Sequence, residues 1–262
     1  DVIPEIMSAA DDNGTEVVKP QVCPACGCKL EEVGAHIYCS DAQHCRPQIV
    51  ARIAHYCSKN ACDIDGISEK TVQLLVDKLG VTSVADLYGL TEEQLLGLEG
   101  IKDKKANNII KAVNDSKAVA LPQFIFALGL DNVGTVTAKD LAVRFESVDG
   151  LSHATQDQLV AIDGVGDVVA EGILQYFREE QNVAIITRLK ELGIDPQYKN
   201  QTVTGVFSGK KVVLTGSLVN YTRGQAGKLI EERGGELSAT VSKSVNLVVA
   251  GEAAGSKLDK AR

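Results

Sequence analysis

The chain has 262 residues, of which 44% are hydrophobic, 4% are aromatic and none is tryptophan, so it suits two or three modest domains with aliphatic cores. Its formal net charge is −8, and residues 64–200 alone carry a net −8, which excludes a polycation that holds DNA by bulk charge. It has no apolar run of 18 residues and no signal segment, so we expect no membrane association and a reducing cytoplasm, where cysteines more often bind metals than form disulfides.

The first residues, DVIPEIM, are typical of an extended strand, with Pro4 suited to a sheet edge. We expect the natural chain to begin well upstream of this strand.

Five of the seven cysteines lie in CPACGCKLEEVGAHIYCSDAQHC, residues 23–45. Cys23 and Cys26 are spaced for one tight turn, and Cys39 and Cys45 form a wider second knuckle. Four thiolates from two knuckles are what a closed tetrahedral zinc site requires, and so short a segment has too small a core to fold otherwise. We therefore predict one structural Zn²⁺ on Cys23, Cys26, Cys39 and Cys45, with no open position for chemistry.

Other interpretations of the cysteines stay open, namely buried thiols without a metal or a redox pair. Cys28 competes as a ligand, although it follows Cys26 too closely to point inward beside it. His36 and His44 are weaker candidates. Cys57 and Cys62 lie on an expected helix and its exit, and we expect them to be small core residues.

Four related segments recur in the middle of the chain, and we name them hairpins 1 to 4: DIDGIS (63–68), LEGIKD (98–103), LDNVGT (130–135) and IDGVGD (162–167). Their last turn positions, Ser68, Lys102, Gly134 and Gly166, are 34, 32 and 32 residues apart. Stretches with helical patterns flank them, such as TEEQLLGL before hairpin 2 and DVVAEGILQYF after hairpin 4. This period predicts a repeated helix–hairpin–helix unit.

The hairpins predict a site for anions. A second helix begins at each one, so its free N–H groups and positive dipole end face outward, and glycine lets a nucleic-acid phosphate approach them. We therefore predict DNA contacts at Gly66, Gly100, Gly134, Gly164 and Gly166. A glycine between helices is also an ordinary C-cap. Only hairpin 4 keeps both glycines, and Ser68, Lys102 and Asn132 each replace one in the other hairpins. The other hairpins would serve packing between repeats or use side chains in place of amides.

A small group of lysines lies beside hairpin 2. Lys102, Lys104 and Lys105 form a local basic patch that we assign to DNA binding. The same run suits a solvated helix start equally well.

The last sixty residues change character. GIDPQYKNQTVTGVF (193–207) is typical of a linker. A buried-strand run, KKVVLTG, is followed by a helix, YTRGQAGKLIEERGG, by two more strands in ELSATVSKSVNLVVAGE and by the start of a helix in GSKLDKAR. Alternating strand and helix predict a small parallel α/β sheet.

An anion pocket is one interpretation of this terminal module. Thr215 and Gly216 at the carboxyl edge of the first strand, Arg223 on the first helix and Lys257 at the next helix start would converge on one anion. An equally good interpretation is that Thr215 and Gly216 only form a turn and that the side chains of Arg223 and Lys257 are solvated.

In this order, the cysteine knuckles, the four hairpins and the terminal module resemble the C-terminal half of bacterial NAD-dependent DNA ligase. DVIPEI looks like the last strand of the ligase's OB domain, and CPACGCKL…YCSDAQHC followed by DIDGIS is similar to its zinc finger and first hairpin. GGELSATVSKSVNLVVAGEAAGSKLDKA looks like a BRCT domain, whose pattern includes the Thr215-Gly216 turn, the basic helix residue and the Ser256-Lys257 pair.

The resemblance implies a multidomain, mostly α fold with a small parallel α/β module. The expected parts are the end of an OB domain and a linker (1–20), a four-cysteine zinc finger (21–62), a helix-hairpin-helix DNA-binding domain (63–195), a linker (196–206) and a truncated BRCT-like domain (207–262).

The implied activity belongs to the intact enzyme, which seals single-strand nicks in duplex DNA during replication and repair. AMP from NAD⁺ is taken by a lysine, passes to the 5′ phosphate at the nick and is displaced by the 3′ hydroxyl. NAD⁺ and Mg²⁺ would belong to the N-terminal half. The hairpin domain would grip the minor groove around the nick, with zinc fixing its angle to the OB domain. We expect a monomer in the bacterial cytoplasm, associated with the nucleoid, with nicked double-stranded DNA as its partner; no BRCT partner is implied.

The sequence also departs from the family. Its hairpins hold fewer glycines, and its BRCT module lacks the final strand and helix, with their late tryptophan. The Lys-x-Asp-Gly motif of the adenylation domain is absent, because the residues two places before Asp65, Asp149 and Asp163 are Asp63, Ser147 and Ala161.

We therefore assign no catalytic residue and expect this chain to bind DNA without sealing it. The alternative is a non-enzymatic repair scaffold that uses the same hairpins to hold junctions or damaged DNA. A Lys-x-Asp-Gly motif and an OB fold upstream of Asp1 would distinguish the ligase from the scaffold.

Overall fold

The structure is a computed structural model that describes residues 18–34, 36–198, 205–238, 240–242, 245–252, 258 and 260. It divides into two compact units, residues 1–198 and 199–262, which we call the helical unit and the sheet unit. The division falls within the predicted linker, and the other predicted boundaries stay predictions. The strand predicted in DVIPEI and most of the last predicted helix lie outside the described residues.

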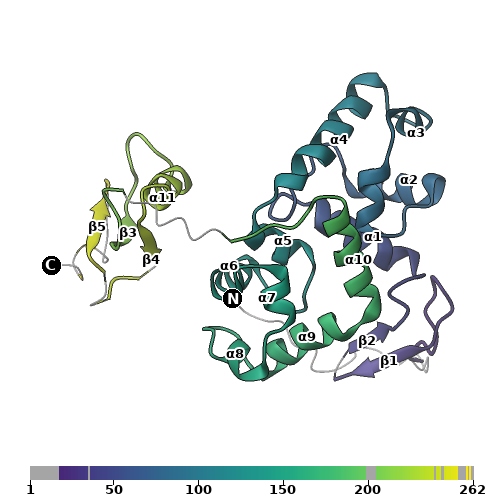
Figure 1. The fold of residues 1–262 in the computed structure, drawn as a ribbon, viewed down its shortest axis with the longest axis horizontal. Coiled ribbons are helices and arrows are strands. Elements are labelled where there is room, and N and C mark those ends of the chain that lie inside the picture. The colour runs from purple at the N-terminus through teal and green to yellow at the C-terminus, as the bar shows by residue number, and fades with distance from the viewer. Residues whose placement is uncertain are drawn as a thin grey trace, which may run out of the picture. The chain divides into compact units, whose positions relative to one another are not determined.

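The helical unit begins with a short segment that has almost no core, which we call the cysteine segment (18–45). Two antiparallel strands, β1 (Leu30–Val33) and β2 (His36–Cys39), form its hairpin, with Leu30 opposite Cys39. The segment ends at Cys45, where α1 (Arg46–Cys57) begins with proline in its first turn. Figure 1 shows the β1–β2 hairpin in purple, with α1 following it.

The rest of the helical unit is built from short helices. They are α2 (Glu69–Leu79), η1 (Val84–Gly89), α3 (Glu92–Leu96), α4 (Asp103–Asp115), η2 (Ser116–Ala118), α5 (Leu121–Ala127), α6 (Thr135–Phe145), α7 (Val148–Ser152), α8 (Gln156–Val160), α9 (Asp167–Arg178) and α10 (Glu180–Glu191). The helix pairs α1–α2, α3–α4, α5–α6 and α8–α9 pack together across hairpins 1 to 4 (Figure 1). The predicted helix–hairpin–helix repeat is confirmed.

The repeats share one aliphatic core because each hairpin carries two apolar side chains that point inward. These pairs are Ile64 and Ile67, Leu98 and Ile101, Leu130 and Val133, and Ile162 and Val165; all are buried except the half-buried Ile162. In each repeat, the residue four places after the last turn position of the hairpin is small and buried. These residues are Val72, Ala106, Ala138 and Ala170. The second helix of each repeat can therefore pack closely against its neighbours.

Helix α1 connects the cysteine segment to the repeats. Its Ile49, Ile53 and Tyr56 are buried in the same core as the hairpins, and α1 is the first helix of the first repeat. Its first turn is also tied to α2, because the guanidinium of Arg46 donates to both carboxylate oxygens of Asp77 at 2.6 and 2.7 Å.

The sheet unit has a central strand that is buried on both faces. Strand β3 (Lys211–Thr215) pairs in parallel with β4 (Glu236–Ser238) on one side and with β5 (Leu247–Ala250) on the other. Helix α11 (Arg223–Glu231) packs its Ala226 and Ile230 against this sheet. The predicted parallel α/β sheet is confirmed, and the run KVVLT is apolar because both faces of such a strand are covered.

None of the helices in the described part of the chain is long and apolar enough to span a membrane.

Candidate metal centre and nucleic-acid interface

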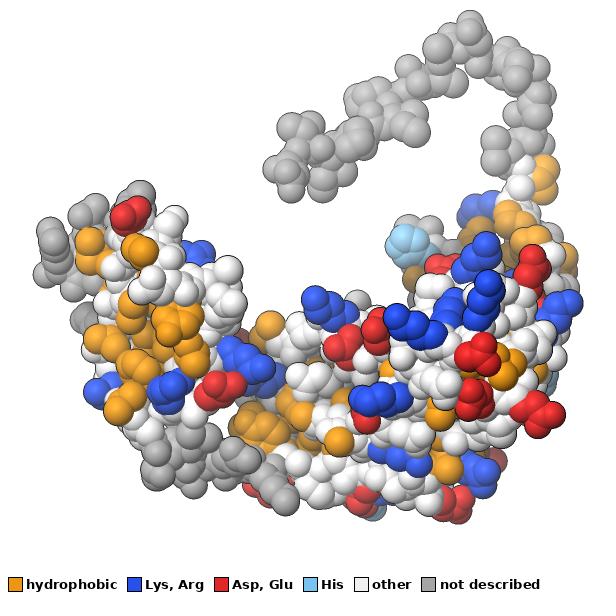
Figure 2. Space-filling view, turned by 90° about the horizontal axis from the view of Figure 1, so that it is seen from above, with side chains coloured by type: hydrophobic (Ala, Val, Ile, Leu, Met, Phe, Trp, Pro, Cys, Tyr) orange, Lys and Arg blue, Asp and Glu red, His pale blue; other side chains and the backbone are white. Residues whose placement is uncertain are grey.

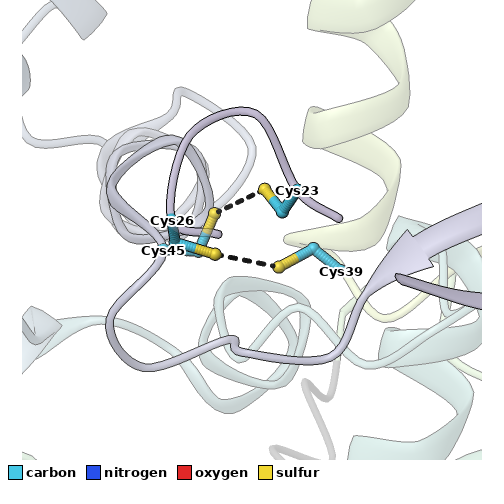
Figure 3. A group of neighbouring side chains, drawn as sticks. All are labelled: Cys23, Cys26, Cys39 and Cys45. Carbon is cyan, nitrogen blue, oxygen red and sulfur yellow. Dashed lines mark hydrogen bonds between the residues drawn. The ribbon is translucent and has the colours of Figure 1, made fainter. Parts of the chain in front are cut away.

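The four predicted zinc ligands come together at one point. The sulfur atoms of Cys23, Cys26, Cys39 and Cys45 all lie within 4.8 Å of one another, and Figure 3 shows their side chains converging. Cys23 Sγ lies 3.8 Å from Cys45 Sγ, and Cys26 Sγ lies 3.5 Å from Cys39 Sγ. Zn–S bonds of about 2.3 Å place sulfurs about 3.8 Å apart at the corners of a tetrahedron, so the spacing fits zinc.

The backbone of the cysteine segment explains this convergence. Cys23 and Cys26 lie on a turn closed by hydrogen bonds between Cys23 and Cys28 and from the Gly27 N–H to the Cys23 carbonyl. Gly27 has a φ of 76°, which glycine adopts without a steric penalty. On the other side, Cys39 ends β2 and Cys45 is the N-cap of α1, so a negative thiolate there faces the positive end of a helix.

The electrostatics of the four thiols favour a bound cation. Hydrogen bonds from the backbone N–H groups of Ala25 and Cys26 lower the pKa of Cys23 to about 7. Burial raises the pKa values of Cys39 and Cys45 above those of free thiols. Because thiolates this close repel one another, full ionisation of the cluster requires a compensating positive charge.

The rival ligands lie elsewhere. Cys28 Sγ is 3.9 Å from the hydroxyl of Ser40, and the ring of His44 is highly exposed and within 3.0 Å of the Asp41 carboxylate. His36 is exposed and makes an edge contact with Tyr38.

Cys57 and Cys62 are buried in the core of the repeats, as expected, and burial raises the pKa of each to about 12. They are therefore poor metal ligands and poor nucleophiles at neutral pH.

The four hairpins share one position with a left-handed backbone, the first of the two glycine positions; in hairpin 1, Asp63 is left-handed as well, with a φ of 48°. Gly66, Gly100 and Gly164 have φ values of 84°, 76° and 80°, and Asn132 takes the equivalent place in hairpin 3 with a φ of 60°. Asparagine tolerates this conformation better than most residues. The sequence predicts that Asn132 replaces one of the hairpin glycines, and its positive φ confirms this prediction.

The second glycine position has a different role. Ser68, Lys102, Gly134 and Gly166 are N-caps with extended backbones, and a Cβ at Gly134 or Gly166 would meet no atom within 4 Å. Glycine there is not needed for the turn, and it leaves the approach to the helix start open.

The helix starts at hairpins 2, 3 and 4 have amides available for a ligand. In hairpin 1, the Ser68 hydroxyl accepts a hydrogen bond from the N–H of Thr71 and so caps α2. The N-caps of α4, α6 and α9 make no such side-chain hydrogen bond. Their first N–H groups therefore have no partner within the helix and can donate to an anion.

The lysines beside hairpin 2 are positioned for a polyanion. Lys102, Lys104 and Lys105 are all exposed, and none of them forms an ion pair with a residue that the structure describes. Figure 2 shows basic and acidic side chains interspersed on the visible face rather than one continuous basic surface. This distribution agrees with a net negative charge and with local contacts to phosphate.

The predicted anion pocket of the sheet unit is described only in part. Gly216, with a φ of 75°, and Arg223 line one hollow with the loop between them. Thr215 is 4% exposed and lies outside that lining, and the Arg223 guanidinium is 3.4 Å from the Leu214 carbonyl. Lys257 lies outside the described residues. Gly216 is also required sterically, because a Cβ there would lie 2.6 Å from the Glu252 carbonyl oxygen.

Three family models match the chain. The SAM-like helix-hairpin-helix tandem matches residues 59–115, the helix-hairpin-helix motif matches residues 123–186, and the BRCA1 C-terminus (BRCT) domain matches residues 202–262. The first two models each cover two of the four hairpins. The repeats therefore form a first pair, hairpins 1 and 2, and a second pair, hairpins 3 and 4.

The whole chain is also similar to curated bacterial proteins. It is 45% identical over 266 residues to a DNA ligase of Clostridium perfringens, 44% to a DNA ligase of Alkaliphilus metalliredigens and 41% over 265 residues to DNA ligase 2 of Clostridium acetobutylicum. Each match covers 100% of this chain and 40% of the relative. The chain is thus related along its whole length to the C-terminal part of bacterial DNA ligases.

Proposed function

We propose that this chain is the DNA-binding part of an NAD-dependent DNA ligase and that it holds nicked duplex DNA for sealing. The observation that carries the proposal is the match of its full length to proteins named DNA ligase. The relatives' names favour a ligase over a non-enzymatic repair scaffold. The two helix-hairpin-helix matches and the uncapped helix starts support binding to phosphate.

The chemistry of sealing would lie outside this chain. The sequence has no Lys-x-Asp-Gly motif, so no residue here is assigned to AMP transfer. NAD⁺ would supply the AMP. Both NAD⁺ and Mg²⁺ would bind to the other 60% of the ligase. The residues of this chain would bind the backbone of the DNA and orient the nick.

The four cysteines would bind one structural Zn²⁺. Their spacing fits a tetrahedral sulfur site. All four coordination positions would be filled by protein, so the metal would hold the turn of Cys23 and Cys26 against the start of α1. Zinc would thereby position the cysteine segment on the first repeat.

The DNA contacts would be made mainly at hairpins 2, 3 and 4. The amides at Lys102, Gly134 and Gly166 would donate to phosphates, while the turn glycines at Gly66, Gly100 and Gly164 hold the hairpins in shape. Lys104 and Lys105 would add charge at hairpin 2.

The sheet unit would bind a further anion at Gly216 and Arg223, with Thr215 supporting the strand end and Lys257 contributing from the next helix. The protein would act as a monomer at the nucleoid in the bacterial cytoplasm.

The test is a binding and sealing assay with the 262-residue chain. We expect binding to nicked duplex DNA without base preference, measured by fluorescence anisotropy, and no sealed product on a gel with NAD⁺ and Mg²⁺. Failure to bind nicked duplex at low salt, or ligation by the pure chain, would overturn the proposal.

A further inference from the structure

The residue in the second helical position after each hairpin divides the repeats into two kinds. In the first pair this residue is Lys70 or Lys104, and in the second pair it is Val136 or Val168. The positions are equivalent, because each lies two residues before the buried residue that anchors its helix. At 100° per residue, two positions turn the side chain to the opposite side of the helix, away from the core.

Both valines are exposed. Val136 is 73% exposed and Val168 is 78% exposed; among the large apolar side chains of the described residues, only Val219 is more exposed than both, and only Val18 lies between them. An apolar side chain in water has unfavourable hydration, and valine is a weaker helix former than lysine. A surface that covers the two valines would remove this cost.

Charge distinguishes hairpin 2 of the first pair from hairpin 4 of the second. Both hairpins carry two carboxylates, Glu99 and Asp103 in hairpin 2 and Asp163 and Asp167 in hairpin 4. Hairpin 2 also has three exposed lysines in or next to it, whereas hairpin 4 has no cation. Attraction between charges therefore suits DNA binding at hairpin 2 and not at hairpin 4. Hairpin 4 instead offers uncapped amides, an open N-cap at Gly166 and the exposed Val168 beside them.

We infer that the two pairs hold the DNA backbone by different physical means, an inference that rests on the proposed function. In the first pair, Lys70 and Lys104 meet phosphates. In the second pair, the amides at Gly134 and Gly166 receive a phosphate, and Val136 and Val168 cover the carbon face of the adjoining deoxyribose. The sugar follows the phosphate along the strand and is its apolar part, so one backbone can satisfy both groups of each hairpin.

The test compares two double variants by anisotropy with nicked duplex DNA between about 50 and 200 mM salt. Val136→Thr with Val168→Thr keeps the shape and helix propensity of the side chains and replaces a methyl by a hydroxyl group. We expect binding to weaken about tenfold at every salt concentration, with an unchanged salt slope. For Lys70→Gln with Lys104→Gln, we expect the salt slope to flatten by about two units.

Two controls make the result specific. Val136→Ile with Val168→Ile keeps the apolar contact and should bind as the wild type does. Val183→Thr changes a valine of α10 that is 43% exposed and belongs to no hairpin or hairpin helix start, and it should also leave binding unchanged. Thermal unfolding of each variant verifies the fold.

If the wild-type chain binds nicked duplex DNA and the affinity of the Val-to-Thr double variant is within twofold of the wild type, this inference is overturned. The proposed function then still stands. An altered salt slope in that variant, or an equal loss in Val183→Thr, would also overturn it. A wild-type chain that does not bind nicked duplex would instead overturn the proposed function.

Discussion

The cysteine segment and the repeats that follow it are neighbours in one unit, yet they are stabilised in different ways. Among the described residues of the cysteine segment, only Cys23 and Cys45 are buried. The repeats share a continuous core that runs from Ile49 to Ile194. A segment without a core needs cross-links, and four converging thiols supply them through a metal, whereas the repeats need only apolar contacts. The stability of the two regions should therefore respond to different changes.

The largest expected effect is the loss of the metal. Cys39→Ser should remove about one equivalent of zinc, because a structural zinc site of this kind is worth about 10–16 kcal/mol and depends on all four ligands. The cysteine segment should become sensitive to protease while the helical circular dichroism of the repeats is mostly retained. Cys28→Ser is the control and should keep its zinc, measured by elemental analysis. Full metal retention in Cys39→Ser would move the assignment to Cys28 or a histidine.

A core substitution in the repeats should have the opposite effect: it should lower the stability of the repeats and leave the zinc content unchanged. Ile109 is fully buried in α4, and its side chain lies next to the backbone of Gly66 in hairpin 1. Ile109→Ala should lower the free energy of unfolding by about 2–5 kcal/mol in denaturant titrations, and the zinc content should not change. Leu96→Ala, at a side chain that is 41% exposed, should have a much smaller effect. Loss of zinc in Ile109→Ala would mean that the two regions are not independent.

The two glycines of hairpin 4 should separate stability from binding. Gly164 has a φ of 80°, so Gly164→Val should destabilise the protein by about 1–3 kcal/mol. Gly166 has a φ of −87° with open space around it, so Gly166→Val should cost less than about 1 kcal/mol.

In binding assays, Gly166→Val should weaken the affinity for nicked duplex roughly tenfold, because its side chain occupies the place of a phosphate oxygen. The salt slope should change little, since no cation is lost. A folded Gly166→Val chain with wild-type affinity at several salt concentrations would exclude phosphate binding at these amides.

The smallest expected effect concerns one lysine. Lys102→Ala should flatten the salt slope of DNA binding by roughly one unit if the ammonium group meets a phosphate, and it should leave stability nearly unchanged because Lys102 is exposed. We also expect hairpin 4 to contribute more to affinity than hairpin 2, since the Lys102 side chain occupies the N-cap position that Gly166 leaves open. An unchanged salt slope would mean that the ammonium group of Lys102 faces solvent and does not contact a phosphate.

The sequence allowed the repeats, the cysteine cluster and the parallel sheet to be predicted because each has a local pattern. A fixed period reveals the hairpins, two knuckles reveal the cluster, and the run KVVLT reveals a strand buried on both faces. The different roles of the two glycine positions in each hairpin could not be predicted. A glycine that is needed for a positive φ and a glycine that leaves a helix start open look the same in a sequence. Likewise, Thr215 looked available for a ligand, and only the packing of the sheet places it in the interior.

Helix α1 also bears on the order in which the chain folds. During synthesis the cysteine segment and α1 leave the ribosome before α2, and an isolated helix of 12 residues is marginal in water. A metal that fixes Cys45 would anchor the N-cap of α1 and lower the entropy lost when that helix forms. The early metal site would then present Ile49, Ile53 and Tyr56 as a ready surface on which the first hairpin condenses.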